Sequence, residues 1–225
     1  MLARMLTPKA LLVVASAALL TACGSAGSSD PDLSHADIAN VKNVRSSFPP
    51  SFKVSDIAPT GIDPKLLQTQ PLPGVTFDPA DCEQFAKQQV LPDGVQGNMS
   101  AVVAEGEGNR FIVIAVETSE PVPSNDPGPN CQKVAYAGAG QRGLVEVVDA
   151  PAIDGAHTLG AHRVVQTTVD GKTRTGELYN YVARFGQFTV IVTANPLVQP
   201  DKPTVPVDTK RAGDLLTAAV SAVKG

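Results

Sequence analysis

The sequence predicts an α+β fold in which an antiparallel sheet packs against helices, one of them an amphipathic helix at the C-terminus. Three observations predict it. Residues 161–194 alternate apolar and polar side chains and are broken only by short turns. The last segment instead repeats apolar residues at helical spacing. The chain also lacks tryptophan and is only 4% aromatic, so its core depends on valine, isoleucine, leucine, alanine and phenylalanine, which favours strands.

The clearest strand pattern lies in the C-terminal half. Residues 161–169 and 172–183 are joined by Asp170-Gly171, a pair typical of the type I′ turn of a hairpin. A second turn at residues 184–187 leads into a strand at 188–194, on which Phe188, Val190 and Val192 share one face. These segments predict a three-stranded antiparallel meander.

The final segment is predicted to be a helix that lies across the sheet. Asp208 is a suitable N-cap, and Lys224 and Gly225 suit the C-terminal end. A helix for a membrane surface or a partner is the alternative, but the polar face is mixed rather than basic. The apolar residues recur at i, i+3, i+4, i+7, i+8 and i+11: Ala212, Leu215, Leu216, Ala219, Val220 and Val223.

Further strands are predicted in the middle of the chain. Residues 98–105 and 110–118 form a hairpin around the turn at 106–109, and residues 144–148 form another strand. The second arm is continuously apolar through residues 111–116, which is typical of a central strand.

The remaining segments are predicted to be less regular. Residues 41–79 are rich in proline and are expected to hold one strand, at 51–57. Residues 79–87 form a short helix with acids in its first turn. Residues 119–130 form a surface loop, and residues 131–136 are either a turn of helix or a short strand.

The first residues have the form of a secretory signal. Arg4 and Lys9 accompany an apolar run, residues 10–20, which is too short to span a bilayer core. The run ends in Leu20-Thr21-Ala22-Cys23, which resembles the lipobox of bacterial lipoproteins. In those proteins the cysteine thiol is acylated and the chain is cut just before it. We therefore expect Cys23 to carry fatty acyl chains such as palmitate, and the alternative is an ordinary signal peptide with a chance cysteine.

This organisation places the protein at the cell membrane, on the extracytoplasmic face. Residues 1–22 are the signal, residues 23–40 a lipidated flexible tether, and residues 41–225 a single extracytoplasmic domain. The full chain carries a formal charge of −4, and loss of Arg4 and Lys9 leaves −6. With no run rich in lysine or arginine, a nucleic-acid partner is excluded.

The two remaining cysteines, Cys82 and Cys131, are expected to form a disulfide, because an even number of cysteines in an oxidising compartment predicts pairing. Closing a loop of this length stabilises the fold by about 3–4 kcal/mol. Two free thiols and a metal-binding pair are the alternatives. A metal site of this kind needs more ligands at close spacing, and there is no CxxC motif or nearby histidine.

Residues 153–222 contain TLGA at 158–161, VDGKTRT at 169–175 and FTVIVTAN at 188–195, followed by the predicted closing helix. In these motifs the chain resembles the LpqN-type lipoproteins of mycobacteria. The resemblance implies a PsbP-like sandwich, an antiparallel sheet flanked by helices. It implies no reaction and brings no catalytic residues. The chain is also similar to the sensor domains of mycobacterial receptor kinases in its expected extracytoplasmic location, its expected disulfide and its mixture of helices and strands. No motif matches between them.

Each motif that suggests a cofactor, catalytic or metal site lacks a neighbouring feature that such a site requires. The run GAGQRG at residues 138–143 spells GxGxxG, but a strand follows it where a dinucleotide site needs a helix, so we expect a turn and no cofactor. His157 and His162 flank the start of a strand, and Asp154 lies near them in sequence. No GxSxG motif supplies a nucleophile, and the histidines have too few neighbouring ligands for a metal. Tyr179 and Tyr181 share one strand face, where a place in the core or on the sheet surface is favoured over a ligand stack.

The predicted anchor places the protein in the cell envelope, and the sequence lacks a recognisable set of catalytic residues. We therefore expect a membrane-anchored envelope lipoprotein that is not an enzyme and acts as a binding or interaction module. Its partner is a protein, a peptide or an envelope lipid or glycan. A carrier of lipid or another hydrophobic ligand is the first alternative, because the same apolar pattern builds a filled or a hollow core. An envelope hydrolase is the second.

Overall fold

A computed structural model describes residues 32–63, 67, 74–87, 91–92, 94–198 and 203–225. The predicted signal peptide, Cys23 and residues 24–31 of the predicted tether lie outside the described residues, so lipidation of Cys23 stays a prediction. The described part belongs to one compact unit, Pro31–Gly225. Within it, no helix is both long enough and apolar enough to cross a membrane.

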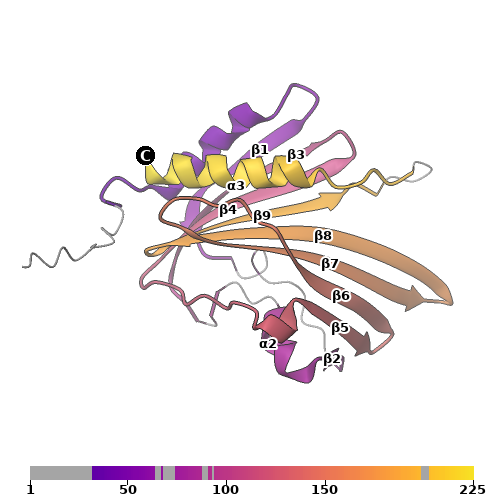
Figure 1. The fold of residues 1–225 in the computed structure, drawn as a ribbon. Helices are drawn as coiled ribbons and strands as arrows, with labels where there is room; N and C mark the ends of the chain where they lie inside the picture. Colours follow the sequence, from indigo (N-terminus) through magenta and orange to yellow (C-terminus); the bar gives the residue numbers. More distant parts are fainter. Residues whose placement is uncertain (1–31, 64–66, 68–73, 88–90, 93, 199–202) are drawn as a thin grey trace, which may run out of the picture. The chain divides into compact units, whose positions relative to one another are not determined.

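One antiparallel sheet dominates this unit (Figure 1). The described residues form nine strands in the order β1-β3-β4-β9-β8-β7-β6-β5-β2, so β3 and β4 and the five strands from β5 to β9 lie beside their neighbours in sequence. The fold is therefore α+β with the sheet predominant, whereas its likeness to the PsbP fold stays a prediction. The strands are β1 (Lys53–Gly61), β2 (Thr76–Asp78), β3 (Gly97–Gly106), β4 (Asn109–Thr118), β5 (Lys133–Gly138), β6 (Gln141–Val148), β7 (His157–Val169), β8 (Lys172–Phe185) and β9 (Phe188–Pro196).

The hairpins form where the turn residues predict them. β3 and β4 pair from Gly97↔Thr118 to Gly106↔Asn109. β7, β8 and β9 form the predicted meander, and β7 joins β8 through Asp170 and Gly171. Both turn residues have positive φ, 50° and 71°, as a type I′ turn requires. The meander also continues through β6 and β5, which extends it beyond the three predicted strands.

The C-terminal helix α3 (Thr209–Lys224) covers one face of the sheet. Asp208 caps it, since its carboxylate accepts a hydrogen bond from the backbone N–H of Arg211 at 2.9 Å. All six apolar residues of the predicted stripe are buried. They pack on β4, β8 and β9. Phe188, Val190 and Val192 of β9 share one face, as predicted, and belong to the same core cluster as the helix residues. We call this side the helix face.

A 3₁₀ helix, η1 (Ile38–Ser47), lies beside α3 on the helix face, and it corrects the predicted tether. The predicted tether extends to residue 40, but the side chain of Asp37 already caps η1 and Ile38 is only 4% exposed. Val41 and Val44 follow Ile38 into the core at a spacing of three, the period of a 3₁₀ helix. The ordered domain therefore begins before the predicted boundary at residue 41.

The opposite face of the sheet carries two smaller apolar clusters. One is built on β3, β4 and β9 around Met99, Ile114 and Ile191. The other lies on β5 and β6 beneath the short helices η2 (Ala80–Cys82) and α2 (Glu83–Ala86), where the short helix of residues 79–87 is predicted. Of the two alternatives for residues 131–136, the strand is confirmed, because β5 begins at Lys133 and η3 (Pro129–Cys131) ends at Cys131.

Candidate binding surface

Part of the helix face extends beyond the core that α3 covers. The apolar core beneath α3 draws its fully buried strand residues from β3, β4, β8 and β9, while β5 contributes none and β6 only the partly buried Val148. In Figure 1 α3 lies over the strands on the β1 side, away from β5. The strand register places Lys133, Glu146, His162 and Tyr179 in one row across β5, β6, β7 and β8. We call this row, with its neighbours Leu144, Val164 and Glu177, the open face.

A stacked pair of rings forms the centre of the open face. The rings of His162 and Tyr179 lie 4.1 Å apart between centroids and are nearly parallel, at 9°. They come from directly opposed positions on β7 and β8, so the sheet itself holds them in contact. The side chain of His162 is only 15% exposed.

Two carboxylates flank the histidine. Nε2 of His162 lies 3.2 Å from Oε2 of Glu177, and Nδ1 lies 3.8 Å from Oε2 of Glu146. Glu146 also forms an ion pair with Lys133 at 2.7 Å. Burial raises the pKa of the Tyr179 phenol, and the negative charges of Glu177 and Glu146 raise it further. The phenol therefore stays protonated and able to donate a hydrogen bond.

Sequence reasoning considered His162 and Tyr179 singly and missed Glu146 and Glu177. The available signal is alternation: every second residue of a strand points to the same face, so one known pair of opposed residues places all the others on their faces. The β7–β8 turn at Asp170-Gly171 fixes that register for His162, Glu177 and Tyr179, whereas the position of β6 depends on a longer connection.

His157 lies away from the open face and has a different acid partner from the one that its sequence suggests. Its Nε2 is 2.6 Å from Oδ1 of Asp126, in the loop before β5, and both side chains are about half exposed. Asp154 instead accepts a hydrogen bond at its backbone oxygen from Lys224. No hydroxyl or thiol of the described residues bonds to either His157 or His162, so the hydrolase alternative gains no nucleophile–base pair there.

The GxGxxG run forms the tight turn between β5 and β6, as predicted. Ala139 and Gly140 have positive φ, 48° and 74°. Gly143 lies under the hydroxyl of Tyr136 and against the backbone oxygen of Val164, where a Cβ has no room. These glycines serve the hairpin and its packing. In the described ranges no three histidine, cysteine, aspartate or glutamate side chains group as metal ligands.

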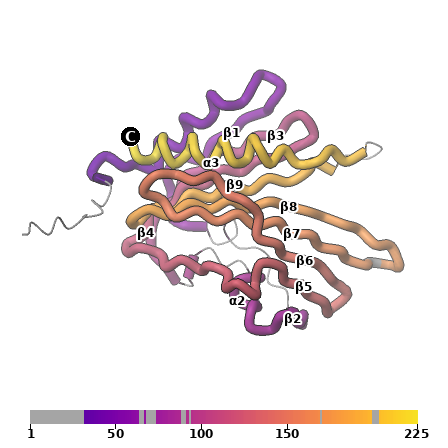
Figure 2. Tube along the Cα trace, in the orientation of Figure 1, coloured from indigo at the N-terminus to yellow at the C-terminus, as the bar shows by residue number. Residues whose placement is uncertain are grey.

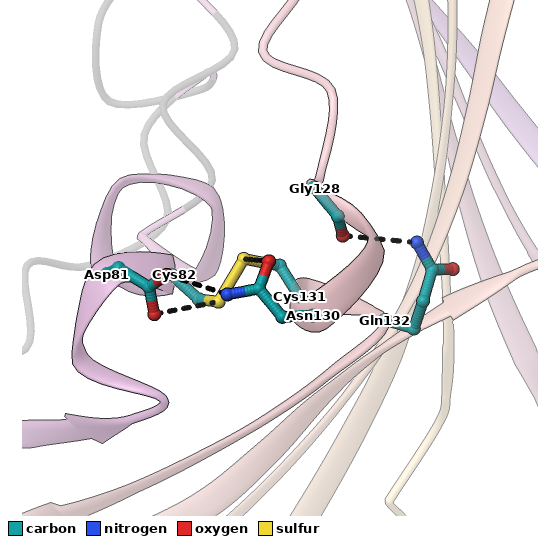
Figure 3. The surroundings of a disulfide bond; sticks show 6 residues. All are labelled: Asp81, Cys82, Gly128, Asn130, Cys131 and Gln132. Atoms are coloured by element: carbon teal, nitrogen blue, oxygen red, sulfur yellow. Dashed lines mark hydrogen bonds between the residues drawn. A yellow bond between two sulfur atoms is a disulfide. The ribbon is translucent and has the colours of Figure 1, made fainter.

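The predicted disulfide is present on the opposite face. Cys82 and Cys131 are bonded, with their Cα atoms 5.5 Å apart, and they tie η2 to η3 (Figure 3). Nδ2 of Asn130 donates to the Asp81 carboxylate at 2.6 Å, which adds a polar link beside the sulfur bridge. The disulfide therefore holds the small helices over β5 and β6.

Beneath these helices lies a buried cation, Arg163, which is 6% exposed. One of its nitrogens donates to the backbone oxygen of Ala86 at the end of α2, and its guanidinium lies 5.9 Å from the centroid of the Tyr136 ring. Burial lowers the pKa of Arg163, and interaction with Tyr136 opposes that change. No carboxylate of the described residues lies within ion-pair distance of it. Arg163 thus anchors α2 to the sheet.

The chain belongs to a family described as a domain of unknown function (DUF5642), which it matches over residues 37–224. Its fold is similar to the X-ray structure of an uncharacterised protein, the Rv0999 ortholog from Mycobacterium smegmatis. The two are 62% identical, with a TM-score of 0.81, over 85% of this chain and 98% of that one. No curated protein matches the chain.

A more distant structural match is the extracellular domain of PknH from Mycobacterium tuberculosis. It is 13% identical and covers 83% of this chain and 91% of that one, with a TM-score of 0.39.

Proposed function

We propose that the protein is a non-catalytic binding module of the cell envelope, anchored on the extracytoplasmic face of the membrane by acyl chains on Cys23. The sequence from Leu20 to Cys23 supports the anchor, because it matches the lipobox pattern. The bond between Cys82 and Cys131 supports an oxidising compartment, where structural disulfides persist. Kinship with the LpqN-type lipoproteins and their PsbP-like fold is part of this proposal, supported by the motifs within residues 153–222.

One observation carries the binding role: the open face presents the His162–Tyr179 stack between Glu146 and Glu177. A sheet face turned to solvent is ordinarily polar. This one mixes a partly buried tyrosine with Leu144 and Val164 and with paired charges. Aromatic residues surrounded by polar partners are typical of binding hot spots.

Strands also suit recognition better than loops do. The residues of the open face lie on β5 to β8, which pair with one another along their backbones. Their positions are therefore fixed before a partner arrives, and little conformational entropy is lost on binding. A catalytic role receives less support, because no nucleophile bonds to His162 or His157 among the described side chains.

Native mass spectrometry of the exported chain tests this function. A binding module is expected to carry its covalent acyl chains, to lack the two thiol hydrogens of Cys82 and Cys131, and to hold no small ligand. A lipid-sized ligand released on denaturation would overturn the proposal in favour of a carrier. Turnover of an envelope substrate that stops on His157→Ala would overturn it in favour of a hydrolase.

A further inference from the structure

Strand β8 is longer than the neighbour on one of its sides. β7 pairs with it along its whole length, from Val169↔Lys172 to His157↔Arg184. β9 pairs with it only from Tyr179 to Phe185. Figures 1 and 2 show this part of β7 and β8, which we call the arm, extending past the end of β9, while β6 pairs with β7 on its other side from Gly160 as far as Thr167. The β8 edge from Lys172 to Leu178, which we call the free edge, therefore has no neighbouring strand among the described residues.

Alternate backbone N–H and C=O groups of the free edge point away from β7. No backbone hydrogen bond within the described part of the chain joins them to another strand. Residues 172–176 are exposed on both faces of the arm. Such an edge is a template on which a further strand can pair.

The two outer edges of the sheet are protected from such pairing. At β1, a side-chain nitrogen of Arg45 donates to the backbone oxygen of Val54 at 3.0 Å, and the same guanidinium pairs with Asp56 at 2.8 Å. β1 also has an irregular register between Ile57 and Thr60. At the other edge, β2 is only three residues long. Bulges, covering side chains, short strands and charged side chains are the usual means of blunting an edge. On the free edge no described side chain covers the backbone, and its protection is limited to the charges of Lys172 and Arg174, which repel a strand of like charge.

Gly176 is a second observation that favours a binding site at the free edge. Other glycines inside these strands are required by close packing: a Cβ on Gly160 would lie 2.6 Å from the backbone oxygen of Val148. A Cβ on Gly176 would meet only Cγ1 of Val165, at an ordinary 3.7 Å, and the φ of Gly176 is not in the left-handed region. Glycine weakens a strand, so one that the fold does not require indicates close approach by another chain or a ligand.

The charges of the free edge select the kind of strand it accepts. Lys172 and Arg174 share a face with Gly176 by strand alternation, and neither forms an ion pair with any described residue. A second copy of this chain would bring the same cations against them, which disfavours self-pairing. An added strand with carboxylates on that face would instead be attracted.

We propose that the free edge, Lys172–Leu178, binds an extended acidic peptide segment of a partner protein as an added β-strand. Backbone hydrogen bonds hold the peptide, carboxylates at its alternate positions pair with Lys172 and Arg174, and the space above Gly176 receives one of its side chains. This site shares Glu177 with the open face, but it uses the backbone edge of β8 and the face that carries Lys172 and Arg174, which is opposite to the face of Glu177 by strand alternation. The inference stands whether or not the open face binds a partner.

The test uses two labelled synthetic peptides, one alternating glutamate with valine and one alternating lysine with valine, added to the exported full-length protein. Fluorescence anisotropy is expected to show binding of the glutamate peptide, weakened by salt, and at least about tenfold weaker binding of the lysine peptide. Amide hydrogen exchange is expected to slow at residues 172–178 when the glutamate peptide binds. Equal binding of both peptides, or slowed exchange at β1 instead, would overturn the proposal.

Three variants sharpen the test. Arg174→Glu is expected to weaken the glutamate peptide by about tenfold, whereas Lys53→Glu, the same kind of charge change on edge strand β1, is expected to leave it unchanged. Gly176→Val is expected to fold with undiminished stability, because its Cβ has room, and still to weaken the peptide. Undiminished binding by Gly176→Val and Arg174→Glu would contradict the site. Dimers of the peptide-free protein with slowed exchange at residues 172–178 would identify a second copy as the occupant and overturn it as well.

Discussion

Burial raises the pKa of all three tyrosines, Tyr136, Tyr179 and Tyr181. The folded protein therefore keeps phenolic protons that the unfolded chain releases near pH 10. Their contribution to stability is fully present below about pH 10 and is lost as the pH rises above it. Tyrosinate absorbance, free of tryptophan interference, is expected to appear at a higher pH in the native protein than in denaturant. Superimposable titration curves would contradict these environments.

A second residue-scale prediction concerns Arg163. Arg163→Ala is expected to lower the free energy of unfolding by about 2–5 kcal/mol, because it leaves a cavity and removes the donor to Ala86. Arg163→Met is expected to lower it less, since it fills the space and removes a buried charge that has no carboxylate partner among the described residues. Urea unfolding measures both, with exposed Arg174→Ala as a near-neutral control. A loss in Arg163→Met as large as that in Arg163→Ala would contradict this account, because it would show that filling the cavity recovers no stability.

Sequence reasoning reached few of these residue-level contacts. The pairing of Cys82 with Cys131 follows from their number and compartment. The contact of Arg163 with Ala86 crosses from a strand to a helix far apart in sequence, and no local pattern encodes it. His162 and Tyr179 could be placed on strands, but their contact depends on the register between those strands.

At the scale of elements, α3 shows how an amphipathic pattern becomes stability. Leu216 lies on α3 and is fully buried against the sheet. Leu216→Ala is therefore expected to lower the free energy of unfolding by about 2–5 kcal/mol. Asp208→Ala removes the N-cap and is expected to lower it by about 0.5–2 kcal/mol. Thr217→Ala, on the exposed side, should change it by less than about 0.5 kcal/mol. Equal losses in urea unfolding for all three variants would contradict this packing.

The disulfide acts on a different part of the fold from α3. The double variant Cys82→Ser, Cys131→Ser is expected to lower the free energy of unfolding by about 3–4 kcal/mol, because the bridge closes a loop spanning 49 positions. Amide hydrogen exchange should accelerate mainly at η2, α2, β5 and β6, the elements that the bridge joins and covers. Acceleration centred on α3 and β9 instead would contradict that assignment.

Elements with strong local patterns were predictable, and those whose apolar residues lie among polar neighbours were not. The turn Asp170-Gly171 and the alternation around it predicted the meander, and the stripe on α3 predicted the closing helix. The sequence predicts a tether and an irregular segment where η1 lies, although Ile38, Val41 and Val44 recur every three residues. That spacing was the available signal, but the segment is polar overall and its helix is stabilised by packing against α3, β3 and β4.

At the scale of the whole molecule, the lipid anchor is the first point to test. Cys23→Ser is expected to move the exported protein from the membrane fraction to the aqueous fraction, because acyl chains hold it at the bilayer. Cys82→Ser is the matched control and should leave the protein in the membrane fraction. Retention of Cys23→Ser in the membrane would show that the anchor lies elsewhere.

The proposed function requires the open face to contact a partner in the envelope. The most direct measurement places a photo-crosslinking amino acid at Leu144, on the open face, and separately at Lys42, an exposed position on η1, in cells that export the protein. A binding module is expected to give a discrete crosslinked species from position 144 and none from position 42, and Glu177→Lys should abolish it. The same products from both positions, or a species that survives Glu177→Lys, would contradict the account.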